Sequence, residues 1–348
     1  MERPNLTNIP KPVVDYIEYL ETLIGQIKST KTTITTADSL NFDALPLKPE
    51  SPTTIQIISV SRLGFAKRTA RHHYLPQHRG GTGNPDFQVD SVDAHAFLAV
   101  MNNGATVLAL TNKGRVFRIP FSRLEEKGLR EPGSWLWERI ELDNGEQVAC
   151  LLPVQATGFI VMVTRYGRIR VLRHHLFGEH MRPGMGVFST QEHGELATAC
   201  WTPGDADILV STRNGMAIRF NEKIIPPPGD QAIRLSDGDE ISGLAPVYSE
   251  SDVFIATADG RGALRKMSGF APNKSMGGSG KILIKSNHVI GIASIRPDDH
   301  IFLLTQQGKV IRFPVDEVPL TDAPVQGVNC MTLRGDEVIS MINSGLIA

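Results

Sequence analysis

Three short patterns in the sequence could carry chemistry, and each lacks the partners that its chemistry needs. Tyr166, next to Arg165, could act as a nucleophile, but it lies in a glycine turn without an acidic metal cluster beside it. GSGKI at 278–282 contains the Gly-Lys of a phosphate loop, yet neither the first glycine nor the final Ser/Thr of that motif is present. The histidines of HHLFGEH at 174–180 lack the spacing of a zinc helix. We therefore expect no catalytic residue, no metal site and no cofactor.

The composition indicates a protein that folds in water. Of 348 residues, 41% are hydrophobic and 21% are charged, and the 36 Lys and Arg nearly balance the 37 Asp and Glu. No run approaches the roughly 18 apolar residues that cross a membrane, and the N-terminus lacks the pattern of a signal peptide. Cys150, Cys200 and Cys330 form no close pair, which fits a reducing compartment. We expect a cytoplasmic protein without a membrane segment.

A hairpin pattern recurs six times from residue 54 onward. A glycine follows Thr or Ser by three residues between β-branched runs, which is the positive-φ position of a tight turn. The glycines are Gly64, Gly114, Gly167, Gly215, Gly260 and Gly308, so the repeat is about 49 residues long. Repeats of this length are typical of β-propellers, but WD and kelch signatures are missing. The sequence predicts an all-β, six-bladed β-pinwheel or propeller-like ring over residues 54–348.

A second series, of short apolar strands, has the same period. Its members centre on Phe97, Cys150, Cys200, Gly243, Gly291 and Ser340. The first five precede the next hairpin glycine by 15 to 17 residues, so we interpret each strand and the hairpin after it as one blade. The first hairpin then lacks its strand, and the last strand lacks its hairpin. We therefore expect residues 338–346 to pair with the hairpin of residues 55–69 and close the ring.

The first fifty residues differ from the repeats. Val13, Ile17, Leu20, Ile24 and Ile27 have the three- and four-residue spacing of one helix face. We predict an amphipathic helix within residues 1–28 and a linker at 29–53, because a Ser/Thr-rich run follows the helical pattern. Two interpretations of the helix stay open: it packs on its own domain, or it contacts a second copy or a partner protein.

Charge is unevenly distributed along this nearly neutral chain. Six windows cover the hairpins and the residues after them, and they hold 24 basic and 5 acidic residues. The windows are 61–83, 111–123, 164–182, 212–223, 259–281 and 305–317. Because hairpins occupy equivalent places in a ring, their cations should form a circular basic track, which favours a phosphate backbone as ligand. Arg118, Arg219 and Arg312 recur in register and are equally open to a structural interpretation.

The six hairpins, together with QHRGGTG at 77–83, resemble the C-terminal β-pinwheel of the DNA gyrase and topoisomerase IV A subunits. The resemblance covers residues 54–348 and implies a six-bladed disc whose outer edge binds and bends DNA. Gyrase-type members carry a QRRGGKG box on the first blade, and His78 and Thr82 replace two of its basic residues. The segment MGGSGK at 276–281 is similar in shape and position in the fifth blade. The family's cleavage domain is not expected, since only about fifty residues precede the blades.

The sequence therefore predicts a non-catalytic protein that binds and bends duplex DNA without sequence preference, in the cytoplasm and its nucleoid. It would act alone or as an accessory to a type II topoisomerase, with the N-terminal helix as a contact for that or another protein. The alternative is a protein-interaction module that has kept the ring and lost DNA wrapping. The predicted DNA-binding residues are Arg62, Lys67, Arg68, Arg71, Gln77, Arg79, Gly80, Gly81, Gly83, Lys113, Arg115, Arg123, Arg165, Arg168, Arg173, Arg213, Arg261, Arg265, Lys266 and Lys281.

The sixth window is the weak point of the predicted track. Asp316 and Glu317 cancel the charges of Lys309 and Arg312 there, and the window adjoins the imperfect box of the first blade. We therefore expect bending of DNA without a stable closed wrap at neutral pH.

Overall fold

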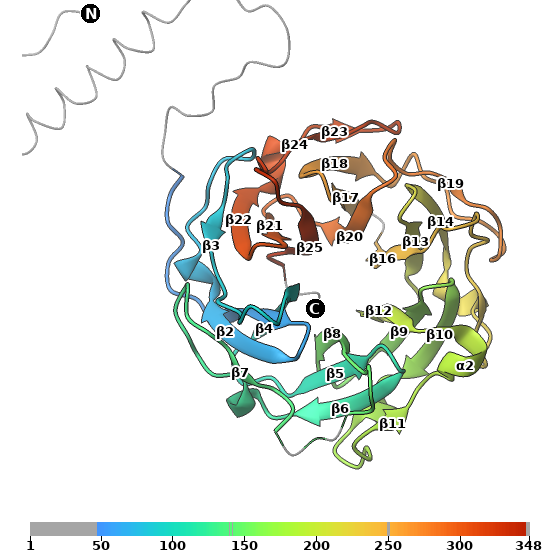
Figure 1. Ribbon diagram of the computed structural model, residues 1–348. Coiled ribbons are helices and arrows are strands. Elements are labelled where there is room, and N and C mark those ends of the chain that lie inside the picture. The colour runs from blue at the N-terminus through green and yellow to red at the C-terminus, as the bar shows by residue number, and fades with distance from the viewer. Residues whose placement is uncertain (1–46, 139, 141, 249–250, 346–348) are drawn as a thin grey trace, which may run out of the picture. The chain divides into compact units, whose positions relative to one another are not determined.

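The computed structural model describes residues 47–138, 140, 142–248 and 251–345 (Figure 1). The helix predicted within residues 1–28 and residues 29–46 of the predicted linker lie outside the described residues. The described chain forms six β-sheets around a central opening, and strand pairing is antiparallel except for one short outer strand (Figure 1). The predicted all-β, six-bladed ring is confirmed.

We number the blades 1 to 6 by their hairpins. The hairpins are β1 (Ile55–Ser61) with β2 (Phe65–Ala70), β5 (Val107–Thr111) with β6 (Arg115–Ile119), β9 (Phe159–Thr164) with β10 (Arg168–Arg173), β13 (Asp207–Thr212) with β14 (Met216–Asn221), β17 (Asp252–Thr257) with β18 (Arg261–Lys266), and β21 (His300–Thr305) with β22 (Lys309–Pro314). The inner strands, which surround the opening, are β4 (His95–Asn102), β8 (Val148–Pro153), β12 (Leu196–Thr202), β16 (Ile241–Val247), β20 (Val289–Ile295) and β25 (Val338–Asn343).

Shorter elements complete the blades. The outer strands are β3 (Asn84–Pro85), β7 (Ser134–Trp135), β11 (Met185–Gly186), β15 (Asp230–Gln231), β19 (Lys281–Ile282), β23 (Leu320–Thr321) and β24 (Val328–Asn329). Single turns of 3₁₀ helix follow five hairpins: η1 (Arg71–His73), η2 (Phe121–Arg123), η3 (His174–Phe177), η4 (Glu222–Ile224) and η5 (Val315–Glu317). One helical turn, α2 (Thr190–His193), precedes β12.

The hairpins turn at the glycines that the repeat predicts. Gly215 has a φ of +77°, and a Cβ there would lie 2.4 Å from Ser286 O, so both the backbone conformation and the space favour glycine. The strands before the turns are apolar and buried on both faces, as all five residues of β5 show. Such strands need a neighbouring sheet on each side, which a ring of blades supplies.

After each hairpin the chain leaves its own blade and supplies the outer strand of the preceding one. β7 follows the hairpin of blade 2 but pairs with β2 of blade 1, where Trp135 lies opposite Phe65. In the same way β11, β15 and β19 pair with β6, β10 and β14, and β23 and β24 pair with β18. The chain then returns along an inner strand to its own hairpin, as β8 does to β5. Neighbouring blades are therefore joined by exchanged strands.

The expected closure of the ring by residues 338–346 is wrong. β25 pairs with β21 of its own blade, from Ile301 opposite Asn343 to Thr305 opposite Val338, and β1 pairs instead with β4. The ring closes where β3 of the first repeat pairs with β22, placing Lys309 opposite Pro85. The 15 to 17 residues from each apolar strand to the next glycine thus lead from the inner strand of one blade to the hairpin of the next blade. Each hairpin takes the strand that follows it, so no blade lacks a strand.

The apolar core lies in the seams between neighbouring blades. At the seam of blades 1 and 6, Ile57 and Leu98 pack against Phe302 and Leu304, and all four are at most 4% exposed. Equivalent buried clusters fill the other five seams. Since every blade buries its apolar faces against two neighbours, the ring is one continuous structure rather than six units.

Candidate nucleic-acid interface

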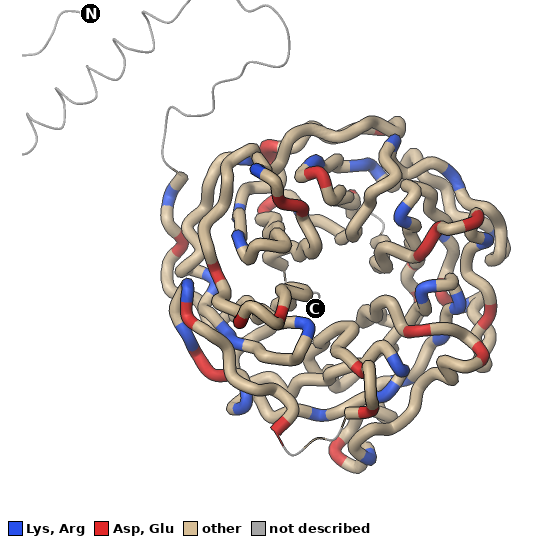
Figure 2. Tube along the Cα trace, viewed as in Figure 1, with Lys and Arg blue, Asp and Glu red and all other residues tan. Residues whose placement is uncertain are grey.

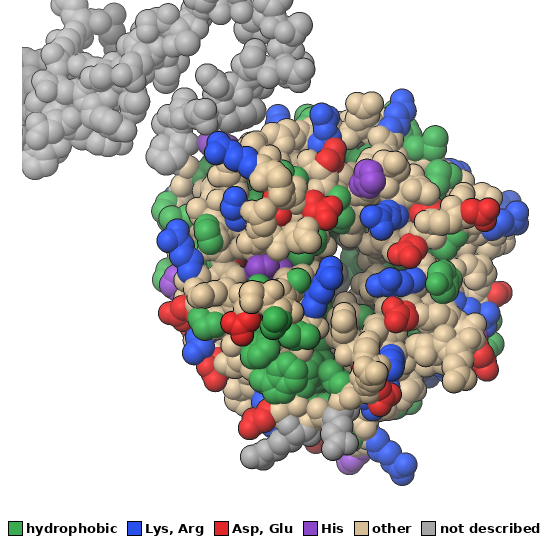
Figure 3. Space-filling view, in the orientation of Figure 1, with side chains coloured by type: hydrophobic (Ala, Val, Ile, Leu, Met, Phe, Trp, Pro, Cys, Tyr) green, Lys and Arg blue, Asp and Glu red, His purple; other side chains and the backbone are tan. Residues whose placement is uncertain are grey.

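Four of the predicted DNA-binding cations lie in hairpin turns at one face of the ring: Arg62, Lys113, Arg165 and Arg213. Some of these side chains contact an acidic side chain or a backbone carbonyl of a neighbouring loop. Lys113 Nζ donates to Asn144 O (2.6 Å), and Arg165 Nε lies 3.6 Å from a carboxylate oxygen of Glu195. Around the opening, basic and acidic side chains alternate on the face seen in Figure 3. This face therefore carries charges of both signs, which weakens any single-sign electrostatic field there.

The arginine four residues after the turn glycine recurs in four blades and connects each blade to the next. Arg68 Nε donates to Leu124 O (2.8 Å), and Arg219 Nη1 to Met267 O (2.7 Å). Arg118 donates to Phe177 O, and Arg312 Nη1 to Tyr74 O (3.1 Å). In three of these blades the acceptor lies in or just after the 3₁₀ turn of the next repeat. These contacts favour the structural interpretation of Arg118, Arg219 and Arg312, and they place Arg68 in the same class.

Two of the predicted surface cations lie in the interior. Lys67 is 0% exposed, and its ammonium forms an ion pair with Asp86 (3.1 Å) while donating to Gly128 O (2.8 Å). Arg265 is 6% exposed, and its Nη1 donates to Leu283 O (2.5 Å). Burial lowers the pKa of Arg265. Neither group can reach a phosphate on the surface, so both leave the set of binding residues.

The box at residues 77–83 is held in the seam between the first and last repeats. His78 Nδ1 lies 2.7 Å from Glu317 Oε1, and Arg79 Nε donates to Glu317 O (2.8 Å). The backbone contributes as well, because Gly80 N donates to Cys330 O (2.7 Å) and Gln77 N to Arg312 O (2.7 Å). The side chains of His78 and Arg79 thus contact the protein itself, and the glycines of the box allow close approach between chain segments.

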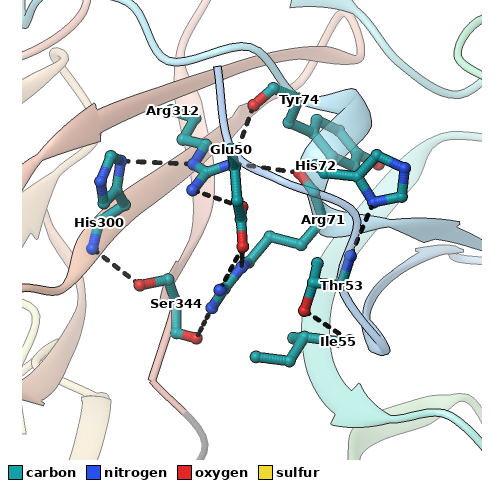
Figure 4. A network of polar contacts seen from close by, with 9 residues as sticks. All are labelled: Glu50, Thr53, Ile55, Arg71, His72, Tyr74, His300, Arg312 and Ser344. Atoms are coloured by element: carbon teal, nitrogen blue, oxygen red, sulfur yellow. Dashed lines mark hydrogen bonds and ion pairs between the residues drawn. The ribbon is translucent and has the colours of Figure 1, made fainter. Parts of the chain in front are cut away.

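The other predicted cations have internal contacts of different strength. Arg115 pairs with the buried carboxylate of Glu146. Burial raises the pKa of Glu146, but hydrogen bonds from Arg115 and Thr111 hold it below its ordinary value. Arg71 binds Glu50, as Figure 4 shows. Three further cations form ion pairs: Arg123 with Glu138, Arg261 with Asp259, and Lys266 with Asp322. Arg168 donates a hydrogen bond to Gly229 O. Arg173 is exposed, and its guanidinium lies over the Phe159 ring.

One stretch of the outer edge differs from the rest of the ring in its charge. No Asp or Glu occurs between Asp259 and Asp298, and the chain there includes the outer strand β19 of blade 4. Lys274, Lys281 and Lys285 are exposed along it, and none has an ion-pair partner among the described residues. Figure 2 shows Lys and Arg positions along this part of the edge, beside β19.

The preceding repeat adds a fourth cation to this stretch. Arg234 is exposed, its backbone N donates to Gly278 O (2.9 Å), and Gly277 N donates in return to Ala232 O (2.9 Å). We call Arg234, Lys274, Lys281 and Lys285 the blade-4 edge patch. The sequence reasoning selected only Lys281 from it. The long run of sequence without Asp or Glu could have pointed to Lys274 and Lys285 as well. Arg234 could not be found in this way, because only the exchange of outer strands between repeats brings it beside this run.

Other functional groups are scarce in the described part of the chain. No three His, Cys, Asp or Glu side chains come together there as a possible metal site, and no helix is long and apolar enough to span a membrane. All three cysteines are buried, and burial raises the pKa of Cys150 and of Cys330 to about 12. Their thiols are therefore protonated and poor nucleophiles.

Comparison with known proteins relates this ring to a family. The family model for the DNA gyrase C-terminal domain, a β-propeller, matches residues 56–89, 105–128, 206–247 and 299–343. The resemblance to the gyrase A C-terminal domain is confirmed. The DNA gyrase A protein of Haloquadratum walsbyi is 26% identical over 306 residues, which are 83% of this chain and 36% of that protein. The DNA gyrase A protein of Staphylococcus aureus is 27% identical over 301 residues, 82% of this chain and 34% of that protein.

Solved structures share the fold. A DNA gyrase A C-terminal domain is similar with a TM-score of 0.71 and 19% identity, over 83% of this chain and 99% of that one. The C-terminal domain of a DNA topoisomerase IV is similar with a TM-score of 0.60 and 21% identity, over 83% and 93%. The chain spans about a third of the length of the gyrase A proteins that it matches.

Proposed function

We propose that this protein binds duplex DNA without sequence preference and bends it along the outer edge of the ring, without catalysing a reaction. The blade-4 edge patch carries the proposal, because its lysines face solvent with no acidic partner in the described chain. Cations of this kind displace counterions from a phosphate backbone, and that gain does not depend on base sequence. The relation to the gyrase A C-terminal domain supports the choice of DNA as ligand.

Bending without a closed wrap fits the distribution of these cations. Curving some 20–30 base pairs by 40–90° costs on the order of 1–6 kcal/mol, so a full circuit needs contacts on every blade. At the seam of blades 5 and 6, His78 and Arg79 contact Glu317, and Arg312 of blade 6 is 4% exposed. DNA that follows the edge would find few free cations there. We propose that the curved path ends at blade 6.

We propose the cytoplasm and its nucleoid as the place of action, alone or as an accessory to a type II topoisomerase. A helix within residues 1–28 and a linker at 29–53 would then be the means of contact with that or another protein. The relation to gyrase A supports this partner class.

A salt titration of duplex binding tests the proposal. We expect the triple substitution K274A/K281A/K285A to make the slope of log affinity against log salt shallower by about 0.9 per lost phosphate contact, equally on unrelated sequences. The matched control is K127A/R261A/K266A, which removes the same charge from cations that already contact Glu125, Asp259 and Asp322. Equal slopes for the two variants would refute the role of the patch, and a wild-type protein without duplex affinity at low salt would refute the function.

A protein-interaction module is the second candidate function. Trp135 and Leu63 are 45% and 47% exposed, and the ring of Trp135 lies edge-on to Phe65 at 5.1 Å. Figure 3 shows a hydrophobic patch on one face of the ring. Exposed apolar surface of this kind is typical of protein contacts. The salt titration separates the two functions, because a module that has lost DNA binds little duplex at any salt concentration.

A further inference from the structure

The carboxylate of Glu50 is held between two arginines that come from the first and the last repeat of the chain (Figure 4). Arg71, just after β2, contacts it through Nη2 (2.5 Å to Oε1) and through Nε (3.1 Å to Oε1 and 3.2 Å to Oε2). Arg312 of β22 places Nη2 2.7 Å from Oε2. Both carboxylate oxygens are thus bound by guanidinium groups, in the forked geometry that arginine also offers to phosphate.

The two arginines are positioned by groups other than Glu50. Arg312 Nη1 donates to Arg71 O (3.2 Å) and Tyr74 O (3.1 Å), and its Nε donates to His300 Nδ1 (3.3 Å). Arg71 Nη1 donates to Ser344 O (2.6 Å). The backbone and His300 therefore hold both guanidinium groups through hydrogen bonds that do not involve Glu50.

Glu50, in contrast, sits on a loosely attached segment. Residues 47–52 form no helix or strand, and Pro49 and Pro52 have no N–H to donate. Among the described residues, the only hydrogen bonds and ion pairs of this segment are those of the Glu50 carboxylate. Its detachment would break contacts at one side chain.

The depression around the clamp is open to solvent and carries further charge. Lys48 and Arg296 are exposed at its border, together with Asp298. Asp299 also lines it, but its carboxylate accepts from Arg296 N (2.9 Å) and Asn343 Nδ2 (3.2 Å). Lys48 leaves together with Glu50, and the three cations that stay, Arg71, Arg296 and Arg312, still outnumber these two acids.

We propose that Glu50 is an internal ligand of a phosphate-binding site, and that a phosphate group replaces it when residues 47–52 detach. Phosphate and carboxylate share the oxygen geometry that a pair of guanidinium groups binds. The phosphate can be that of a DNA backbone or free inorganic phosphate. The site lies between blades 1 and 6, because Arg71 follows β2 and Arg312 is in β22, so it is distinct from the blade-4 edge patch beside β19.

Thermal unfolding of the full-length chain tests the site itself. Glu50→Gln removes the charge partner of Arg312, which is 4% exposed, so we expect a lower Tm than wild type in chloride. Inorganic phosphate at equal ionic strength should recover at least half of that loss. The matched control is Glu126→Gln, which removes a carboxylate that pairs with Arg68 of the same blade at 2.5 Å. Wild type and E126Q should gain far less from phosphate.

Equal gains in all three proteins, or no gain in E50Q, would overturn the proposal. If E50Q does not fold, Glu50→Asp decides the matter, because it keeps the charge but cannot reach both arginines as well. E50D should show the same phosphate-specific gain in Tm, smaller in size. Its absence would overturn the proposal equally.

Duplex binding then identifies the source of the phosphate, and this arm rests on the proposed function. If the group belongs to DNA, E50Q should bind duplex more tightly than wild type and E126Q, with a salt slope steeper by up to about 0.9. If duplex binding is unchanged while inorganic phosphate still stabilises E50Q, the ligand is free phosphate. A wild-type protein that binds no duplex would refute the proposed function and leave the thermal result standing.

Discussion

The first and fifth repeats contain similar glycine-rich loops, but the basic side chains of one contact an acid of the protein and the lysine of the other faces solvent. In QHRGGTG at 77–83, His78 and Arg79 contact Glu317 at the seam of blades 5 and 6. In MGGSGK at 276–281, Lys281 is exposed, and its Nζ lies 5.7 Å from the centre of the Phe270 ring. Both loops use glycine to bring backbones together. The comparison teaches that a glycine-rich motif locates a close backbone approach, whereas the neighbouring acids decide whether its cations are free.

The largest expected effect is on stability and belongs to the first repeat. Lys67→Met leaves the buried carboxylate of Asp86 without its ammonium, so we expect the free energy of unfolding to fall by about 3–5 kcal/mol. Lys281→Met, at the exposed edge, should change it by no more than about 0.5 kcal/mol. Urea denaturation measures both. If K67M is as stable as wild type but binds DNA more weakly, Lys67 is a DNA-binding residue rather than a structural one.

Glu317→Gln acts on the box directly. The carboxylate of Glu317 contacts His78 Nδ1 and accepts from Arg79 N (2.7 Å each), so its neutralisation should cost about 1–3 kcal/mol of stability. The substitution also removes a negative charge from the seam, and we expect tighter duplex binding at low salt. Calorimetry and a gel shift measure the two effects. An unchanged Tm would show that the box is not held by this carboxylate.

The seam of blades 1 and 6 should also be sensitive to acid. Burial, and then the charges of Arg312 and Arg71, lower the pKa of His300 to about 4, against the smaller opposing effects of Glu50 and Asp316. The unfolded chain takes up this proton below about pH 6.5 and the folded chain only near pH 4. The free energy of unfolding should therefore fall as the pH drops through this range. In the variant His300→Gln, the free energy of unfolding should depend less on pH in this range. The same pH dependence in wild type and variant would contradict the prediction.

The smallest expected effect belongs to Arg79. Its guanidinium donates to Glu317 O and Asn329 O (3.1 Å), so Arg79→Ala should leave the salt slope of duplex binding unchanged. Lys281→Ala should make that slope shallower by up to about 0.9. A titration of both variants in parallel checks the contrast. If only R79A makes the salt slope shallower, Arg79 of the box contacts DNA and Lys281 does not.

The fold could be predicted from the sequence further than the site. Turn glycines such as Gly215 need a positive φ, and this local requirement repeats six times, so it marks the blades without tertiary information. The closing strand was misassigned because spacing along the chain does not say which edge a strand joins; β3 pairs with β22 across more than two hundred residues. The site depended on partners from other repeats: Asp86 for Lys67 and Glu317 for Arg79. A tally of charges along the chain cannot show such pairings.

The pairing of β3 with β22 also bears on the order in which the ring is completed during synthesis. Asn84 and Pro85 leave the ribosome more than two hundred residues before Lys309 and Val310, their partners. Until the sixth hairpin exists, the first repeat has an outer segment with nothing to pair with, and the seam core around Ile57 and Leu98 stays uncovered. Contacts so distant along the chain are slow to form. The nascent protein must therefore carry an exposed apolar face through most of its translation, and the last repeat to emerge is the one that covers it.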